Sequence, residues 1–293
     1  MPYADSKGVR LYYEEAGKGT PIVFVHEFAG DLRSWEPQMR HFSRRYRCIA
    51  FNARGYPPSD VPTAGSAYSQ RIAADDIANV MRSLRIPKAH IVGCSMGGFA
   101  TLHFGLIHPR LAKSLTAVGV GYGSDLDKYK QFYRDNDEMA SRFEELGTPE
   151  AVKPYQIGPA RVQMQNKDPR VFQEFCEQFA QHSATGSANT LRGVQMKRPS
   201  VYSLEKKLRA LKVPLHMMSG DEDNNCLEPS IFIKRVCMSA WLTVFPGTGH
   251  AVNLEEVDLF NRIVGDFIAQ VDSGCWRPRD PRALNKSTML KKG

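Results

Sequence analysis

A serine between two glycines is the first group in this sequence that could do chemistry. The segment Gly93–Gly97, with Ser95 at its centre, follows the strand-like run His90–Val92 and precedes a run of small, helix-forming residues. A strand, a turn and a helix in this order predict a nucleophile elbow, in which side chains at either glycine would collide with neighbouring backbone. The turn would lift the Ser95 hydroxyl above a sheet, at a helix N-terminus whose dipole favours developing negative charge.

A histidine late in the chain could be the base that this serine needs, because a free hydroxyl is a poor nucleophile at neutral pH. His250 stands out among the eight histidines, since it lies in the glycine-containing loop Pro246–Ala251 between a predicted strand and the last helix. A loop at the carboxyl edge of a parallel sheet could carry it over the serine. His90 and His103 lie within predicted regular elements, and we interpret them as structural.

A carboxylate must then hold the imidazole in the right tautomer and stabilise its protonated form. The loop Ser219–Asn225 follows a buried strand and contains Asp221, Glu222 and Asp223. The chain order would be serine, acid, histidine, which differs from the orders in chymotrypsin and subtilisin. The residues alone leave open which of the three carboxylates serves.

The elements that must position these groups alternate along the chain. Hydrophobic periodicity predicts strands at Val9–Glu14, Pro21–Val25, Arg47–Phe51, His90–Val92, Ser114–Val120, Val213–Met218 and Trp241–Phe245. It predicts helices at Ser34–Phe42, at Ser69–Leu84, from the elbow to about His108, and from about Glu255 to Val271. Such alternation predicts an α/β fold with a mostly parallel sheet covered by helices on both faces.

The alternation stops between about Tyr122 and Ala210, where the sequence is helix-like and broken by prolines and glycines. We predict an inserted helical cap, or lid, at 122–210. The core would then comprise 1–121 and 211–271, followed by a basic tail at 272–293. Aromatic and methionine residues of the cap could line an apolar pocket, although most residues of this kind belong to a core.

Composition limits the class of protein. A chain of 293 residues with 42% hydrophobic content can fill one large core, or a core and a modest inserted domain. No apolar run of about 18 residues is present, so we expect no membrane span. The N-terminus lacks the basic and then apolar pattern of a secretory signal, so we expect a cytoplasmic protein. Six scattered cysteines without a C-x-x-C pair indicate free thiols and neither a zinc site nor disulfides.

Much of the net charge of +8 lies in the tail, because the segment from Arg277 to Lys292 contains six Lys and Arg residues and a single acidic residue, Asp280. Such a tail could contact an acidic partner, but solvated tails are more common. We therefore expect a small-molecule substrate and no nucleic-acid partner. The chain could also form a homodimer.

From Gly8 to about Phe267 the sequence resembles the α/β-hydrolase family, in particular its capped esterase, enol-lactonase and carbon–carbon bond hydrolase branch. The resemblance rests on four segments, Gly93–Gly98, Asn52–Gly55, Gly220–Asp223 and Gly249–Glu256. It implies the α/β-hydrolase fold and neither a metal nor an organic cofactor.

Carried over residue by residue, the resemblance makes Ser95 the nucleophile and His250 the base and then the acid. In the family the orienting acid usually lies three residues after the loop glycine, which selects Asp223, with Asp221 as the alternative. The oxyanion hole would be formed by the backbone amides of Met96 and, from the loop after the third strand, Phe28.

Glu27 departs from the family pattern, because a loop that usually reads His-Gly reads His26-Glu27 here. A fixed charge about 4 Å from the oxyanion would cost roughly 4 kcal/mol at an effective dielectric of 20, or about a thousandfold in rate. Glu27 must therefore point away, pair with a cation, for which Arg54 is the candidate, or be protonated. Dienelactone-hydrolase-like proteins carry a glutamate in a similar loop, where it engages the nucleophile. We favour a structural ion pair over such a modulating role.

These features predict a serine hydrolase that cleaves a carboxylic ester or lactone through an acyl-enzyme. The same triad could hydrolyse a carbon–carbon bond in a vinylogous diketone, an acidic substrate that Arg161, Arg192 or Arg198 of the cap could bind. A slow-turnover ligand receptor or an inactive scaffold is the alternative of another class.

Overall fold

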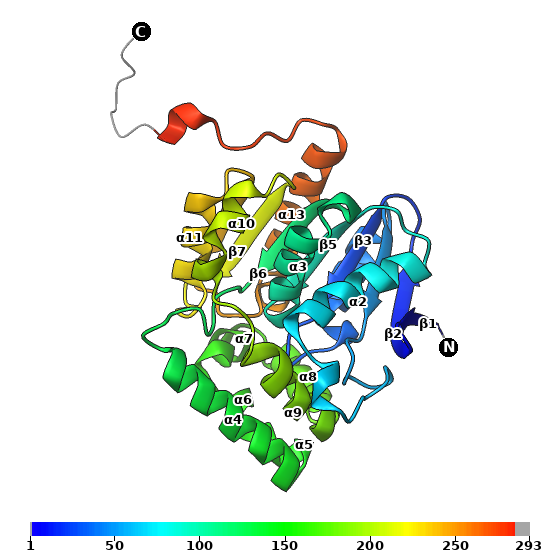
Figure 1. Cartoon of the computed structure of the whole chain (residues 1–293), viewed down its shortest axis with the longest axis vertical. Coiled ribbons are helices and arrows are strands. Elements are labelled where there is room, and N and C mark those ends of the chain that lie inside the picture. The colour runs from blue at the N-terminus through cyan, green and yellow to red at the C-terminus, as the bar shows by residue number, and fades with distance from the viewer. Residues whose placement is uncertain (1, 285–293) are drawn as a thin grey trace.

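The strands form a single eight-stranded sheet in the order β1-β2-β4-β3-β5-β6-β7-β8 (Figure 1). The structure, a computed structural model, describes residues 2–284. The strands are β1 (Tyr3–Ser6), β2 (Val9–Ala16), β3 (Pro21–Val25), β4 (Arg47–Phe51), β5 (Ala89–Cys94), β6 (Ala112–Val118), β7 (Leu215–Gly220) and β8 (Ala240–Phe245). Strands β1 and β2 are antiparallel to their neighbours, and β4, β3, β5, β6, β7 and β8 run parallel to one another.

The α-helices of the core surround this sheet. They are α1 (Glu36–Phe42), α2 (Gln70–Ser83), α3 (Met96–Ile107), α10 (Glu205–Ala210), α11 (Leu227–Val236), α12 (Val252–Glu255) and α13 (Val257–Asp272). Short 3-10 helices are η1 (Leu32–Trp35), η2 (Gly65–Ala67), η3 (Pro109–Leu111), η4 (Pro159–Arg161), η6 (Val201–Leu204) and η7 (Pro281–Leu284), and η5 (Leu191–Gln195) is a π-helical turn.

Alternate side chains of each central strand enter two separate hydrophobic clusters. In β3, Val23 and Val25 join the cluster beneath α2, α3 and α11, while Ile22 and Phe24 join the cluster beneath α1 and α13. Successive side chains of a strand point to opposite faces, so a continuous apolar strand can fill both clusters. This arrangement confirms the predicted α/β fold with a mostly parallel sheet covered on both faces.

The chain between β6 and β7 forms a group of helices outside the sheet (Figure 1). They are α4 (Tyr129–Leu146), α5 (Thr148–Ala151), α6 (Lys153–Gln156), α7 (Val162–Lys167), α8 (Pro169–Phe179) and α9 (Ala184–Thr190). We call residues 129–195, through η5, the helical segment. Within the part of the chain that the structure describes, no strand lies between Val118 and Leu215. Helix α10, inside the predicted cap range, packs instead with α11 in the core.

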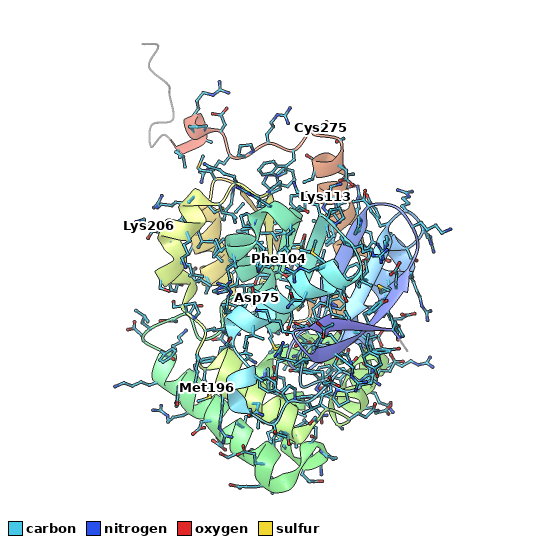
Figure 2. The ribbon with its side chains drawn as sticks, turned by 45° about the vertical axis from the view of Figure 1, so that its right-hand side comes forward. Asp75, Phe104, Lys113, Met196, Lys206 and Cys275 are labelled. Carbon is cyan, nitrogen blue, oxygen red and sulfur yellow. The ribbon has the colours of Figure 1, made fainter. Side chains whose placement is uncertain are left out.

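The helical segment covers the carboxyl edge of the sheet. Its buried residues Phe143, Phe175 and Phe179 share one cluster with Phe28, which follows β3, and Met96, which follows β5. Figure 2 shows Met196, just after the segment, and Cys275, near the C-terminus, toward opposite ends of the molecule. The beginning of the predicted basic tail therefore lies away from the covered edge, and Lys286, Lys291 and Lys292 lie outside the described residues.

The four-residue strand β1 and the ten-residue helix α11 are among the elements that were not predicted from the sequence. Helix α11 contains Pro229, which is tolerated because it lies in the first helical turn, where its missing N–H has no intrahelical acceptor. Among the described residues, no helix is long and apolar enough to cross a bilayer.

Candidate active site

Ser95 lies at the sharp turn from β5 into α3, with a backbone that few non-glycine residues adopt. Its φ and ψ are 53° and −113°, outside the broad allowed regions for an L-residue, so the surrounding packing must hold it there. A Cβ at Gly93 would collide with the carbonyl of Gly97, and a Cβ at Gly97 would collide with the carbonyl of Val25. Both glycines of the elbow are therefore required by close backbone approach.

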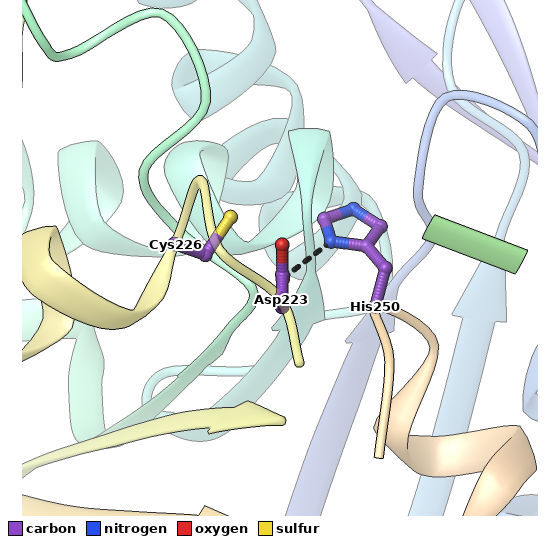
Figure 3. A group of neighbouring side chains, drawn as sticks. All are labelled: Asp223, Cys226 and His250. Atoms are coloured by element: carbon purple, nitrogen blue, oxygen red, sulfur yellow. Dashed lines mark hydrogen bonds and ion pairs between the residues drawn. The ribbon is translucent and has the colours of Figure 1, made fainter. Parts of the chain in front are cut away.

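His250 and Asp223 form a buried pair on neighbouring loops. His250 Nδ1 lies 2.6 Å from Asp223 Oδ2, and the two residues are 7% and 5% exposed (Figure 3). The loops can approach because Gly220, at the end of β7, lies against the carbonyls of Thr248 and Gly249, where a Cβ would collide. Nδ1 then donates to the carboxylate, which directs Nε2 away from it.

Burial and charge oppose each other in this pair. Burial alone would raise the pKa of Asp223, but the charge of His250 and its hydrogen bond outweigh burial and hold that pKa below its usual value. Burial alone would lower the pKa of His250, but Asp223 outweighs it and raises that pKa above the usual value. The carboxylate is therefore ionised at neutral pH and stabilises the imidazolium that base catalysis would form.

The structure does not bring Asp221 to the histidine. Asp221 is exposed and accepts a hydrogen bond from the amide of Thr248 at 3.0 Å, which closes the loop between β8 and α12. Glu222 is also exposed and accepts from the side chain of Gln163. Of the three candidate carboxylates, Asp223 is the one that contacts His250.

His250 and the elbow meet at the same sheet edge. The thiol of Cys94, next to Ser95 in sequence, lies 3.9 Å from the carbonyl oxygen of His250. Gly119, which follows β6 with a φ of 61°, lies so close that an added Cβ would be 3.0 Å from His250 Cε1. The imidazole therefore lies at the end of β6, and the backbone of His250 lies at the end of β5.

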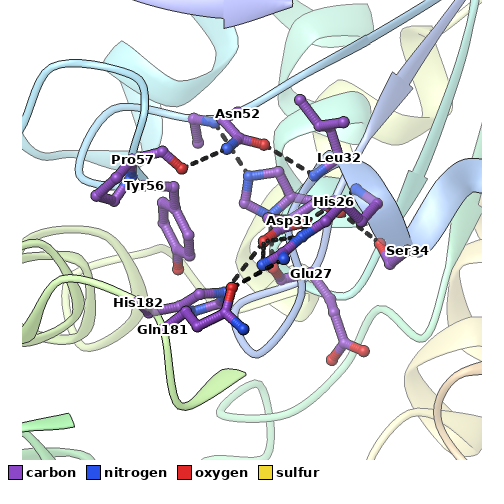
Figure 4. Close-up of polar contacts among 12 residues, drawn as sticks. His26, Glu27, Asp31, Leu32, Ser34, Asn52, Tyr56, Pro57, Gln181 and His182 are labelled. Carbon is purple, nitrogen blue, oxygen red and sulfur yellow. Dashed lines mark hydrogen bonds and ion pairs between the residues drawn. The ribbon is translucent and has the colours of Figure 1, made fainter. Parts of the chain in front are cut away.

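The loop after β3 carries Phe28 and is held by a neutral histidine. His26 Nδ1 donates to the carbonyl of Glu27 at 2.7 Å, and His26 Nε2 accepts from the amide of Ala53 at 3.0 Å. Burial lowers the pKa of His26 to about 4, which agrees with one donating and one accepting ring nitrogen. The Tyr56 hydroxyl donates to the carbonyl of Phe28 at 3.0 Å. Around this loop, Asn52 joins Leu32 to Pro57 (Figure 4).

The two amides expected to form an oxyanion hole belong to the residues that follow β5 and β3. Met96 is the first residue of α3, so its N–H has no intrahelical acceptor. Within residues 2–284, no oxygen accepts a hydrogen bond from the amide of Phe28. The side chains of both residues belong to one hydrophobic cluster.

Glu27 forms an ion pair with Arg161 of the helical segment. The prediction that Arg54 would be its partner was wrong. Arg161 Nη1 donates to Glu27 Oε1 at 2.9 Å, and Nη2 donates to Oε2. The side chains of Arg161 and Glu27 are 1% and 4% exposed. Arg54 instead pairs with Asp76 of α2. Glu27 and Arg161 are 134 positions apart, and no local sequence pattern links them.

Glu27 carries its charge in this pair. Burial alone would raise the pKa of its carboxyl, but Arg161, assisted by His250 and His26, outweighs burial and holds that pKa below the usual value. The protonated form considered from the sequence is therefore disfavoured. Arg161 supplies the counter-charge beside the loop of Phe28.

The three arginines proposed from the sequence to bind an acidic substrate have different surroundings. Arg161 is taken by Glu27, and Arg192 forms ion pairs with Asp137 and Glu144. Arg198 is buried over the ring of Phe99, with its guanidinium carbon 3.8 Å from the ring centroid. Its Nη1 and Nη2 donate to the side-chain oxygen of Gln195 and the carbonyl of Tyr122, and within the described chain its Nε has no hydrogen-bond acceptor.

Asp223, Cys226 and His250 could supply oxygen, sulfur and nitrogen ligands to a metal ion, since these atoms lie within 4.8 Å of one another (Figure 3). Two ligands of one tetrahedral Zn²⁺ lie about 3.3 Å apart, given bonds of about 2.0 Å. The 2.6 Å contact between Asp223 and His250 is instead a direct hydrogen bond. The arrangement therefore fits a proton-sharing pair better than a metal site.

Comparisons with known proteins agree with this fold. A family model described as the alpha/beta hydrolase fold matches residues 20–151. The AB hydrolase superfamily protein YisY of Bacillus subtilis (strain 168) is 26% identical over 283 residues, covering 88% of this chain and 95% of that protein.

Two solved structures are similar over most of the chain. The enol-lactonase from Burkholderia xenovorans LB400 has a TM-score of 0.79 at 20% identity, covering 92% of this chain and 100% of that one. A meta-cleavage product hydrolase from Pseudomonas fluorescens IP01 has a TM-score of 0.72 at 22% identity, covering 92% and 98%. Both belong to the group of enzymes that the sequence resembles.

Proposed function

We propose that this protein, a hydrolase with the α/β-hydrolase fold, is a serine hydrolase that cleaves a small carboxylic ester or lactone through an acyl-enzyme. The observation that carries the proposal is the strained Ser95 at the same sheet edge as the buried His250–Asp223 pair. Strain of this kind persists only where surrounding structure enforces it, and it concentrates at functional sites. The lactonase among the structural neighbours supports the choice of substrate class.

The reaction would proceed in two halves. Ser95 Oγ attacks the carbonyl carbon of the substrate while its proton passes to His250 Nε2, and the negative charge moves to the carbonyl oxygen. The amides of Met96 and Phe28 stabilise that oxyanion. His250 then protonates the leaving alcohol as the carbon–oxygen bond breaks. A water molecule, deprotonated by His250, releases the acid and restores Ser95.

The protonation states fit this cycle. Asp223 stays ionised throughout, because its pKa lies below the usual range. It fixes the tautomer in which His250 Nε2 is the acceptor for the serine proton. The ionised Glu27 does not oppose the oxyanion as an isolated charge, because Arg161 neutralises it.

Active-site labelling tests the proposal. A fluorophosphonate probe should label the wild-type protein and leave Ser95→Ala unlabelled, and a short p-nitrophenyl ester should be turned over only by the wild type. The loss in kcat should be on the order of a millionfold. Labelling of Ser95→Ala would contradict the assignment of the nucleophile.

A second candidate is hydrolysis of a carbon–carbon bond in an acidic vinylogous diketone. Arg198 favours it, since this arginine is buried and its hydrogen bonds go to uncharged oxygens, those of Gln195 and Tyr122. Burial lowers the pKa of its guanidinium to about 10, so it still carries its charge at neutral pH. A buried charge of this kind would be stabilised by a substrate carboxylate.

A slow-turnover receptor is the alternative from another class. It would share the labelling by fluorophosphonate, because labelling requires only the activated serine. Turnover separates the two: a hydrolase releases product over many cycles, whereas a receptor retains its ligand after about one.

A further inference from the structure

A dipeptide of the helical segment contacts both loops of the candidate site. Arg161 makes the two-point ion pair with Glu27, the residue before Phe28. The carbonyl of the preceding residue, Ala160, accepts a hydrogen bond from the amide of His250 at 3.4 Å. The loop after β3 and the loop after β8 are thus joined through two adjacent residues that belong to neither.

We propose that Ala160–Arg161 is a positioning element. It holds the loop after β3, which carries Phe28, and the loop after β8, which carries His250, at a fixed distance from each other, and it balances the charge of Glu27. The site would then be complete only while the helical segment is docked on the core. This inference deepens the proposed function and rests on it, since the two loops would carry an oxyanion donor and the base.

The surroundings of Arg161 support a fixed geometry. Its guanidinium carbon lies 4.5 Å from the ring centroid of Phe175 and 5.5 Å from that of Tyr155. A planar guanidinium that binds a carboxylate at two points while its faces lie on rings has little freedom to rotate. Displacement of Arg161 would therefore move Glu27 and with it the adjacent amide of Phe28. A misplacement of about 1 Å can reduce a rate by about a hundredfold.

The ion pair also places two opposite charges near the imidazole. Glu27 raises the pKa of His250 and Arg161 lowers it, although burial and Asp223 have larger effects. Other titratable groups facing this region are Glu255, which accepts from the amides of Gly249 and Ala251, and the thiols of Cys94 and Cys226. Removing one member of the pair leaves the other charge unbalanced, so the two single changes should act in opposite directions on His250.

Titration of the His250 imidazole by NMR tests the charge balance without any turnover. Glu27→Gln leaves Arg161 unneutralised and should lower the pKa of His250 by about half a pH unit or more. The matched control is Asp76→Asn, which changes an equally buried acid to its amide in the Arg54–Asp76 pair. That control should lower stability and leave the His250 titration unchanged. If Glu27→Gln moves the titration no more than Asp76→Asn does, the proposal is wrong.

The double variant Glu27→Gln/Arg161→Met separates charge from positioning. With neither charge present, the pKa of His250 should return toward the wild-type value, whereas the loops should stay unanchored. At a pH high enough to deprotonate His250 fully, we expect kcat for the p-nitrophenyl ester to remain about tenfold or more below the wild-type value, with KM nearly unchanged. Recovery of wild-type kcat in this variant would overturn the positioning role. This variant also provides the test if Glu27→Gln alone does not fold, since it buries no unpaired charge.

Failure of the proposed function would look different. If the wild-type protein neither reacts with fluorophosphonate nor hydrolyses esters, the proposal that it is a serine hydrolase is contradicted. The NMR titration would still show whether Glu27 and Arg161 balance the charge at His250.

Discussion

His250 Nδ1 donates to Asp223 Oδ2 at 2.6 Å, in a pair that is buried although its two residues are 27 positions apart in the sequence. Asp221, only two residues earlier, instead accepts from the amide of Thr248 at the exposed side of the loop. Two carboxylates in one short loop therefore have separate tasks. One is suited to orient the imidazole, and the other closes a turn.

Amide substitutions distinguish these two tasks. Asp223→Asn should reduce kcat by on the order of ten-thousandfold, because an amide donor at this point favours the wrong tautomer of His250. Asp221→Asn should change kcat by less than about tenfold, since a side-chain oxygen can still accept from Thr248. Steady-state kinetics on one ester measures both. A larger loss in Asp221→Asn would show that the orienting acid has been misassigned.

The pH profile should rise through the pKa of His250. A general base must be neutral, so kcat/KM should increase as the pH rises through this pKa. Asp223 holds the pKa above the usual value for histidine of about 6.5. In Asp223→Asn the raising charge is gone and burial remains, so the residual activity should rise at a lower pH. A profile that moves to higher pH, or does not move, would contradict the assignment of His250 as the base.

Arg161→Met should be strongly destabilising. It leaves Glu27 buried without a counter-charge, and breaking a buried pair in this way typically costs about 3–5 kcal/mol. The free energy of unfolding in urea measures the loss. Replacing both members, as in Glu27→Leu/Arg161→Met, should recover most of it because no charge is left buried. A loss below about 1 kcal/mol in the single variant would mean that water reaches the pair.

Arg198→Met should show whether Arg198 binds an acidic substrate, as the second candidate reaction requires. If Arg198 binds a substrate carboxylate, KM for an ester with an acidic acyl chain should rise by about tenfold or more, while KM for a neutral ester stays within about threefold. Arg192→Met is the matched control, since Arg192 already pairs with Asp137 and Glu144. Equal effects of Arg198→Met on both esters would favour a purely structural role.

Much of the fold was predictable because its signals are local. Strand β3 lies at Pro21–Val25, as predicted, since an unbroken apolar run can be buried on both faces of a sheet. The elbow was predictable because its two glycines are required by close contacts. Gly93 lies against the carbonyl of Gly97, and Gly97 lies against the carbonyl of Val25, so neither position has room for a side chain. Strand β1 was missed because Tyr3–Ser6 is short and half polar, and its position depends on pairing with β2.

The sequence by itself determined the alternating elements and the residue types at the sheet edge, because periodicity and turn chemistry act over a few residues. Only the tertiary structure decided which distant groups meet. The sequence offered Arg54 for Glu27, whereas the docked helical segment brings Arg161 instead and leaves Arg54 to Asp76. A buried charge must find its partner in space, and the burial that makes the partner necessary arises only when the helical segment packs against the loop after β3.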